Sequence, residues 1–362
     1  MGSYPWAATV ALVIALVVDA MVFSSPALWR TIEVPQNLYN LLENAVVNDR
    51  RELLDAEPSS VFLIGSSRLE HGFAPDQIPS LGLSRERLVK LAHPHFFPFE
   101  MRAVAETVAA HRPEVVVLAL AELETHATID LRSGASFGDM DAVWELVANM
   151  GFDYAVEHRT QLMRIAFSGW FDTYHFRGVL NQAGLGAFRR FPGRDGLQSN
   201  NTFGSATEAS SLEGDQALVD LVAELDAQFP GPVSIASRPQ FRSLRSISTG
   251  DHARANLALL SRTIEILTEV GTRVVIIEPP LYPRARALYD ERAREEFLRF
   301  AEEAATHELV SFVPLSSSRK FGPLGFKDLT HLNGAGGRPF ARIVTNAIAA
   351  ELKRSRLNDR EG

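Results

Sequence analysis

The clearest pattern in the chain is a series of short apolar runs separated by longer amphipathic stretches. The runs occupy residues 61–65, 88–91, 114–120, 271–277 and 308–314. Aliphatic and β-branched runs of this length are typical of parallel strands that are buried on both faces. Residues 99–111, 251–270 and 338–353 read as helices; the second shows helical spacing at Leu257, Leu260, Ile264 and Leu267. The alternation predicts βαβ units and an α/β fold with a mostly parallel sheet.

The first segment of the chain has a different pattern. Between Trp6 and Phe23 every residue is apolar except Thr9 and Asp19. The length of this segment is close to the lower limit for a membrane-spanning helix, which needs about 17–25 residues. A secretory signal peptide is the alternative. No Lys or Arg precedes the segment and no small-x-small cleavage site follows it, so an uncleaved anchor is favoured. Trp6 and Trp29 are then candidates for the membrane interface.

Asp19 stands out within this apolar segment. One interpretation places it at a shallow depth, with its carboxylate reaching the headgroups. The other places it against a helix of an integral-membrane partner, because ionisable groups inside a bilayer are costly and are usually paired. The sequence leaves both open.

The chain divides into segments of different character. We expect a membrane anchor at 1–30, a connecting amphipathic helix at 31–58, the α/β domain at 59–129 and 250–355, and a polar tail at 356–362. Residues 130–249 form an insertion, rich in aromatic and arginine residues over 151–191. The insertion is read as a helical subdomain with its own core; a lid or a membrane-surface helix is the alternative.

Composition narrows the function classes. The 362 residues carry a formal net charge of -8, and no basic cluster that would suit nucleic acid is present before the chain's end. The chain has no cysteine, which excludes thiol catalysis and Cys-ligated metals. We expect no metal and no cofactor.

Candidate chemistry lies near both ends of the α/β domain. Ser67 follows the first apolar run, at the carboxyl end of a predicted parallel strand, where open α/β sheets bind ligands. Far along the chain, Asp328 and His331 are three residues apart, a spacing that places both on one face of a helical turn. Together they could form a Ser-His-Asp triad. The structural alternatives are a helix N-cap at Ser67 and a local Asp328–His331 hydrogen bond.

The ordered set of these motifs, with Glu278-Pro-Pro280 after a strand, resembles the SGNH/GDSL hydrolase superfamily. In particular it is similar to the membrane-anchored bacterial branch that includes relatives of the alginate O-acetyltransferases and of the lipoteichoic-acid D-alanylation protein. The resemblance covers about 59–125 and 271–352. It implies a three-layer αβα sandwich, and a single-pass protein of the cytoplasmic membrane whose main domain is extracytoplasmic.

The resemblance also assigns roles to residues. It implies that Ser67 is the nucleophile, His331 the general base and Asp328 the carboxylate that orients it. Two positions depart from the family pattern. Ala92 or His95 stands where a glycine is expected, and Glu122 stands where an asparagine is expected. Both family residues serve the oxyanion, and losing one such donor can cost about a hundred- to a thousandfold in rate.

Other polar residues near these motifs have two interpretations each. Arg68 could bind an anionic acyl or sugar group, or pair with a neighbour such as Glu70. Glu122 and Glu124 could act as a general acid and base, or be solvated loop carboxylates. His93 and His95 alternate in a way that would suit a metal, although no third ligand is evident.

Two functions follow from the sequence. The first is a membrane-anchored extracytoplasmic esterase or O-acyltransferase acting on envelope glycan or lipid. The second is a non-catalytic subunit that keeps the same fold and is docked by its helix and insertion to a larger membrane complex. The Ser67–His331 motif favours the first, and the altered oxyanion positions favour the second.

Overall fold

The computed structural model divides the chain into two compact units. The first comprises Met1–Asp55 and Asp130–Phe203, and the second comprises Ala56–Ile129 and Gly204–Gly362. The residues described are 4–32, 41–57, 60–73, 88–93, 96–129, 131, 139–170, 180, 250–282, 290–315, 321–322, 325–327 and 330–361.

The second unit is built on a five-stranded, wholly parallel sheet. Its strands are β1 (Val61–Gly65), β2 (Leu88–Ala92), β3 (Val115–Ala119), β4 (Arg273–Ile277) and β5 (Val310–Val313), in the order β2-β1-β3-β4-β5. The prediction of an α/β fold with a parallel sheet is confirmed. This order is doubly wound, with its topological switch point between β1 and β3, and such folds bind ligands outside the carboxyl ends of the strands at that point.

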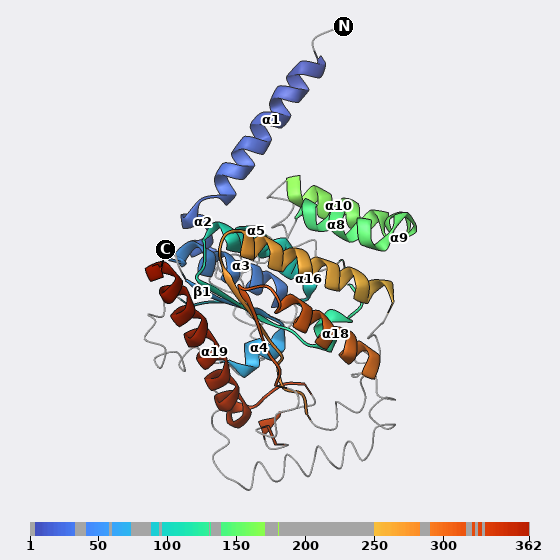
Figure 1. Ribbon diagram of the computed structural model, residues 1–362. Coiled ribbons are helices and arrows are strands. Elements are labelled where there is room, and N and C mark those ends of the chain that lie inside the picture. Colours follow the sequence, from blue (N-terminus) through green and yellow to red (C-terminus); the bar gives the residue numbers. More distant parts are fainter. Residues whose placement is uncertain are drawn as a thin grey trace, which may run out of the picture. The chain divides into compact units, whose positions relative to one another are not determined.

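Helices cover the sheet because its central strands carry no polar face. Every residue of β1, β3 and β4 is buried. The flanking helices of this unit are α4 (Ser67–Gly72), α5 (Pro98–Ala110), α6 (Glu122–Thr125), α16 (Asp251–Glu269), α18 (Glu291–Ala304) and α19 (Gly334–Glu361). The pair α5 and α16 packs together and touches β1 and β4, while α4 and α19 form a second pair (Figure 1).

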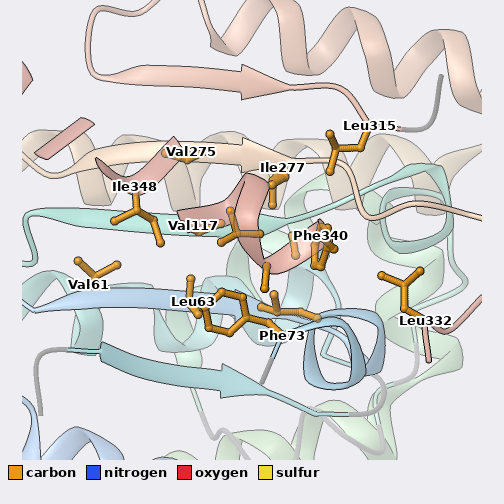
Figure 2. Packing of buried hydrophobic residues seen from close by; sticks show 14 of the residues in the cluster. Val61, Leu63, Phe73, Val117, Val275, Ile277, Leu315, Leu332, Phe340 and Ile348 are labelled. Carbon is orange, nitrogen blue, oxygen red and sulfur yellow. The ribbon is translucent and has the colours of Figure 1, made fainter. Parts of the chain in front are cut away.

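The core that positions the candidate site lies between the sheet and the pair α4 and α19. Alternate strand residues point into it, including Leu63, Val117 and Val275, and they meet Phe73 and Phe340 (Figure 2). Full burial of one such side chain contributes about 1.5–3 kcal/mol. The packing therefore fixes α4 and the start of α19 against the same face of the sheet.

The first unit is helical in its described parts. It contains α1 (Tyr4–Phe23), α2 (Pro26–Thr31), α3 (Leu41–Asp55), α8 (Met140–Met150), α9 (Phe152–Glu157) and α10 (Arg159–Trp170). The helices α2 and α3 are joined by an ion pair between Arg30 and Asp55, 2.7 Å apart. The three helices α8, α9 and α10 pack on one another.

No helix within the described residues is both long enough and apolar enough to cross a membrane. The predicted membrane span is therefore not supported. The helix α1 nevertheless exposes most of its large apolar side chains, for example Val13 at 53% and Met21 at 69%.

Candidate active site

Ser67 lies at the end of the central strand β1, on the first residue of α4. The last residue of β1, Gly65, packs closely against the neighbouring strand, because a Cβ there would lie 2.9 Å from Ala119 Cβ. The tight turn into α4 therefore has no room for a side chain at Gly65. Ser66 caps α4, and its Oγ accepts a hydrogen bond from the backbone N–H of Arg68. The N-cap role considered for Ser67 thus belongs to Ser66, and the Ser67 hydroxyl remains available for other contacts.

His331 lies in a short loop that leads into α19. Phe326 and Leu332 form an antiparallel bridge across this loop, and the backbone N–H of Lys327 donates to the carbonyl of His331 at 3.0 Å. The Oδ1 of Asn333 then accepts from the first backbone N–H groups of α19. His331 is therefore held by a bridged loop, where the sequence suggested a helical turn.

The fold brings Ser67 and His331 together. Ser67 Oγ lies 2.9 Å from His331 Nε2, although the two residues are 264 positions apart. On the other side of the ring, His331 Nδ1 lies 3.1 Å from Thr330 Oγ1. His71 packs edge-on against the same imidazole, with ring centroids 5.1 Å apart. The third member of the predicted triad, Asp328, lies outside the described residues.

A buried carboxylate, that of Glu124, binds the residues on either side of Ser67. Its Oε1 accepts the Ser66 hydroxyl at 2.8 Å, and its Oε2 lies 3.1 Å from Arg68 Nη1. The backbone N–H of Ala121 also donates to Oε2, at 3.0 Å. All three partner groups donate a hydrogen bond to Glu124, which suits an ionised carboxylate because its oxygens only accept hydrogen bonds. Glu124 is fully buried, so it is not a solvated loop carboxylate.

Arg68 is also buried, at 2% exposure. Besides Glu124, its Nη2 donates to the carbonyls of Pro279 at 2.6 Å and Pro280 at 3.2 Å. The guanidinium thus joins the segments that follow β1, β3 and β4. Glu124, Pro279 and Pro280 are its partners among the described residues, whereas the sequence favoured Glu70.

Glu122 occupies a different environment from Glu124. Its side chain is fully buried, and neither carboxylate oxygen has a hydrogen-bond donor among the described residues. Arg294 Nη1 lies 3.7 Å away but is closer to Glu278, at 2.9 Å. Burial raises the pKa of the Glu122 carboxyl, and the nearby charge of Glu278 raises it further. The backbone N–H of Glu122 itself, together with Arg68 and Arg294, opposes the shift.

Glu70, on α4, is the other acidic group near the site with a perturbed pKa. Burial raises the pKa of its carboxyl. Four basic groups oppose that shift: Lys90, His93, Lys327 and His331. Several basic groups therefore lie near the Glu70 carboxyl.

Ala92 and His93 lie at the carboxyl end of β2. Ala92 is partly buried and pairs in register with Gly65. His93 is buried with its ring 4.4 Å from that of Phe96, while His95 lies outside the described residues. Within the described ranges, no three His, Asp or Glu residues are grouped so as to hold a metal ion.

Trp6, Asp19 and Trp29, which the sequence singled out as membrane or partner contacts, lie in the first unit. Trp6 is exposed at 66%, and Asp19 is partly buried on α1. Trp29 is buried at 2%, and its Nε1 donates to the carbonyl of Phe23 at 2.7 Å. Trp29 thus serves the packing between α1 and α2 and does not present its ring to the surroundings.

Three interactions at this site were not predicted from the sequence. They are the binding of both Ser66 and Arg68 by Glu124, the hydrogen bonds from Arg68 to two carbonyls, and the packing of His71 against His331. The one feature of the sequence that could have indicated the Glu124 contacts is that Glu124, like Ser66, follows the carboxyl end of an apolar strand. No family model matches the chain, and no curated protein matches it.

Proposed function

We propose that the protein is a serine esterase or O-acyltransferase of the SGNH type. The observation that carries the proposal is the 2.9 Å contact between Ser67 Oγ and His331 Nε2 at the carboxyl end of the central strand. Two further features agree with it. The site lies at the topological switch point of the sheet, and the resemblance in sequence assigns nucleophile and base to these same two residues.

In the proposed mechanism, Ser67 Oγ attacks the carbonyl carbon of an ester while His331 Nε2 takes the hydroxyl proton. His331 then gives that proton to the leaving alkoxide, and an acyl-Ser67 remains. Water or an acceptor hydroxyl next attacks the acyl group, with His331 again removing the proton and returning it to Ser67. Thr330 Oγ1 can accept from Nδ1–H of His331, which leaves Nε2 free to act as base.

The oxyanion that forms during both steps needs hydrogen-bond donors. The backbone N–H of Ser67 is one candidate, because the first N–H groups of a helix have no acceptor within it. The end of β2 at Ala92 is the second proposed position, since it pairs in register with Gly65. Glu122 is not assigned this role, because it is fully buried.

We further propose that the substrate is an acyl ester of envelope glycan or lipid, and that α1 attaches the protein to a membrane. The substrate class comes from the resemblance. The attachment is motivated by the exposed apolar side chains of α1. Cell fractionation tests it: the full chain should sediment with membranes, and a chain lacking residues 1–32 should not. Equal distribution of the two chains would count against attachment.

The test of the enzymatic proposal is covalent labelling of the folded protein by a fluorophosphonate probe. We expect labelling at Ser67, located by peptide mass spectrometry, and its loss in Ser67→Ala and in His331→Gln. Ser261→Ala is the matched control, because Ser261 is an exposed serine on α16 whose hydroxyl is bound to a carbonyl of its own helix. Absence of labelling at Ser67 in the folded wild-type protein would overturn the proposal.

The alternative function is a non-catalytic subunit of a membrane complex. The position of Glu122 favours it, because a buried carboxylate stands where the family pattern has an oxyanion-binding amide. Purification in mild detergent distinguishes the enzyme from the non-catalytic subunit. A stoichiometric complex that is unaffected by Ser67→Ala would favour the alternative, whereas a monomer that is labelled at Ser67 would exclude it.

A further inference from the structure

Both chain neighbours of Ser67 are bound to the same buried carboxylate. Ser66 Oγ donates to Glu124 Oε1 at 2.8 Å, and Arg68 Nη1 lies 3.1 Å from Oε2. The exposed fraction is 2% for the Arg68 side chain and 0% for that of Glu124. Water is therefore excluded from the pair, and opposite charges attract more strongly there than at the surface.

The arrangement exceeds what α4 needs in order to form. Ser66 alone caps this helix by accepting the backbone N–H of Arg68 at 3.3 Å. Glu124 lies on α6, directly after β3, and accepts from the N–H of Ala121, the N-cap of that helix. Arg68 adds a link to the segment after β4 through the carbonyls of Pro279 and Pro280. The backbone on both sides of Ser67 is thus tied to the neighbouring strands of the sheet.

We infer that Glu124 is a positioning residue for the nucleophile: by holding Ser66 and Arg68, it directs Ser67 Oγ at His331 Nε2. The inference rests on the proposed function and deepens it. Glu124 binds Ser66 and Arg68, the neighbours of Ser67, and its full burial keeps it from substrate. It acts through geometry, and a displacement of about 1 Å at a reacting atom can cost about a hundredfold in rate.

The test compares the rate of fluorophosphonate labelling at Ser67 in variants of the full-length protein. Glu124→Gln keeps the shape of the side chain and an acceptor for Ser66 but loses the charge pair with Arg68. We expect its labelling rate to fall about 10- to 100-fold. Ser66→Ala removes one of the two contacts and should lower the rate about tenfold, while Ser66→Thr restores the hydroxyl and should recover most of it.

A matched control separates positioning from a general loss of stability. Arg273 and Glu351 form a second buried pair, 3.2 Å apart, with side-chain exposures of 8% and 5%. Arg273 is the first residue of β4, so this pair lies at the amino end of the sheet, away from Ser67. Glu351→Gln should lower the unfolding temperature as Glu124→Gln does but leave the labelling rate within about twofold of wild type.

A second measurement keeps this inference distinct from the proposed function. NMR signals of the His331 imidazole report its contact with Ser67 without any turnover. If the wild-type protein is not labelled, the proposed function fails, and the inference then stands only if Glu124→Gln shifts these signals while Glu351→Gln does not. Should Glu124→Gln fail to fold, Ser66→Ala carries the same comparison. Wild-type labelling rates or unchanged imidazole signals in the folded Glu124 and Ser66 variants would overturn it.

Discussion

At the scale of single residues, two buried glutamates that lie two positions apart have opposite environments. Glu124 accepts hydrogen bonds from Ser66, Arg68 and Ala121. Glu122 accepts none from the described residues. Burial disfavours the charged form of Glu122 and raises the pKa of its carboxyl.

We predict that Glu122→Gln stabilises the protein at neutral pH. A carboxyl whose pKa is raised on folding contributes its full stability only below the pKa of the unfolded chain, and this contribution is lost as pH rises through the folded value. The advantage of Glu122→Gln should therefore grow as the pH rises above about 4.5, the ordinary pKa of a glutamate carboxyl. Urea unfolding at several pH values measures it.

Glu302→Gln is the control for this prediction, since Glu302 is an exposed residue of α18 and its substitution also removes one negative charge. A stability difference for Glu122→Gln that shrinks with rising pH would contradict the reasoning. Such a result would mean that the attraction between Glu122 and Arg294, 3.7 Å apart, outweighs the cost of burial.

At the scale of elements, the loop that carries His331 is fixed by close packing against the first turn of α19. A Cβ at Gly336 would overlap the carbonyl of Gly325 and lie 2.8 Å from a methyl group of Leu332. The glycine at the start of this helix is therefore a requirement of the loop's position.

We predict that Gly336→Ala destabilises the protein by about 1–3 kcal/mol, because the added methyl group overpacks the contact. It should also slow labelling of Ser67, since the displaced loop contains His331. Thermal unfolding and probe kinetics measure the two effects.

Gly322→Ala is the matched control for that change, because a Cβ at Gly322 meets no atom within 4 Å. Equal stability and equal labelling for the two alanine variants would show that the loop adapts and that the packing at Gly336 is not required.

Some strands and helices of the fold were predicted from the sequence, and others were not. The strands β1, β3 and β4 were found because their burial on both faces demands unbroken apolar runs. The helix α18 was not predicted, although Ala293, Phe297 and Ala301 are spaced for one buried face. Charged residues fill most of the positions between these three, so the narrow apolar face is not evident from the sequence.

The candidate site was predictable only in part. The pairing of Ser67 with His331 followed from motifs, because each lies beside a recognisable element. The Arg68–Glu124 pair could not be read from the sequence, since charged side chains choose partners by the order of strands, which a single sequence does not specify. The expectation that Arg68 pairs nearby with Glu70 shows this limit.

At the scale of the whole molecule, the long insertion leaves and re-enters the α/β unit at neighbouring points. The backbone N–H of Ile129 donates to His252 Nδ1 at 3.4 Å, and Asn256 Nδ2 donates to the carbonyl of Ala127 at 2.8 Å. Segments on either side of the insertion therefore contact each other directly, and the sheet does not depend on the insertion to bring β3 and α16 together.

We predict that residues 131–249 can be replaced by a linker of about six Gly and Ser residues without loss of the α/β fold, because connections of this length are common between adjacent elements. Circular dichroism and thermal unfolding should show a cooperative transition, and the probe should still label Ser67. The same shortened chain with Ser67→Ala is the control. A chain that fails to unfold cooperatively would show that the insertion contributes to the core.

The sequence separation of Ser67 and His331 has a consequence for biosynthesis. The imidazole is translated 264 residues after the hydroxyl, a delay on the order of 10 to 50 seconds at about 5–20 residues per second. During that interval the nascent polypeptide carries the serine hydroxyl without the imidazole. Under the proposed function, a chain that terminates before His331 would hold Ser67 without its base and would not react with the fluorophosphonate probe.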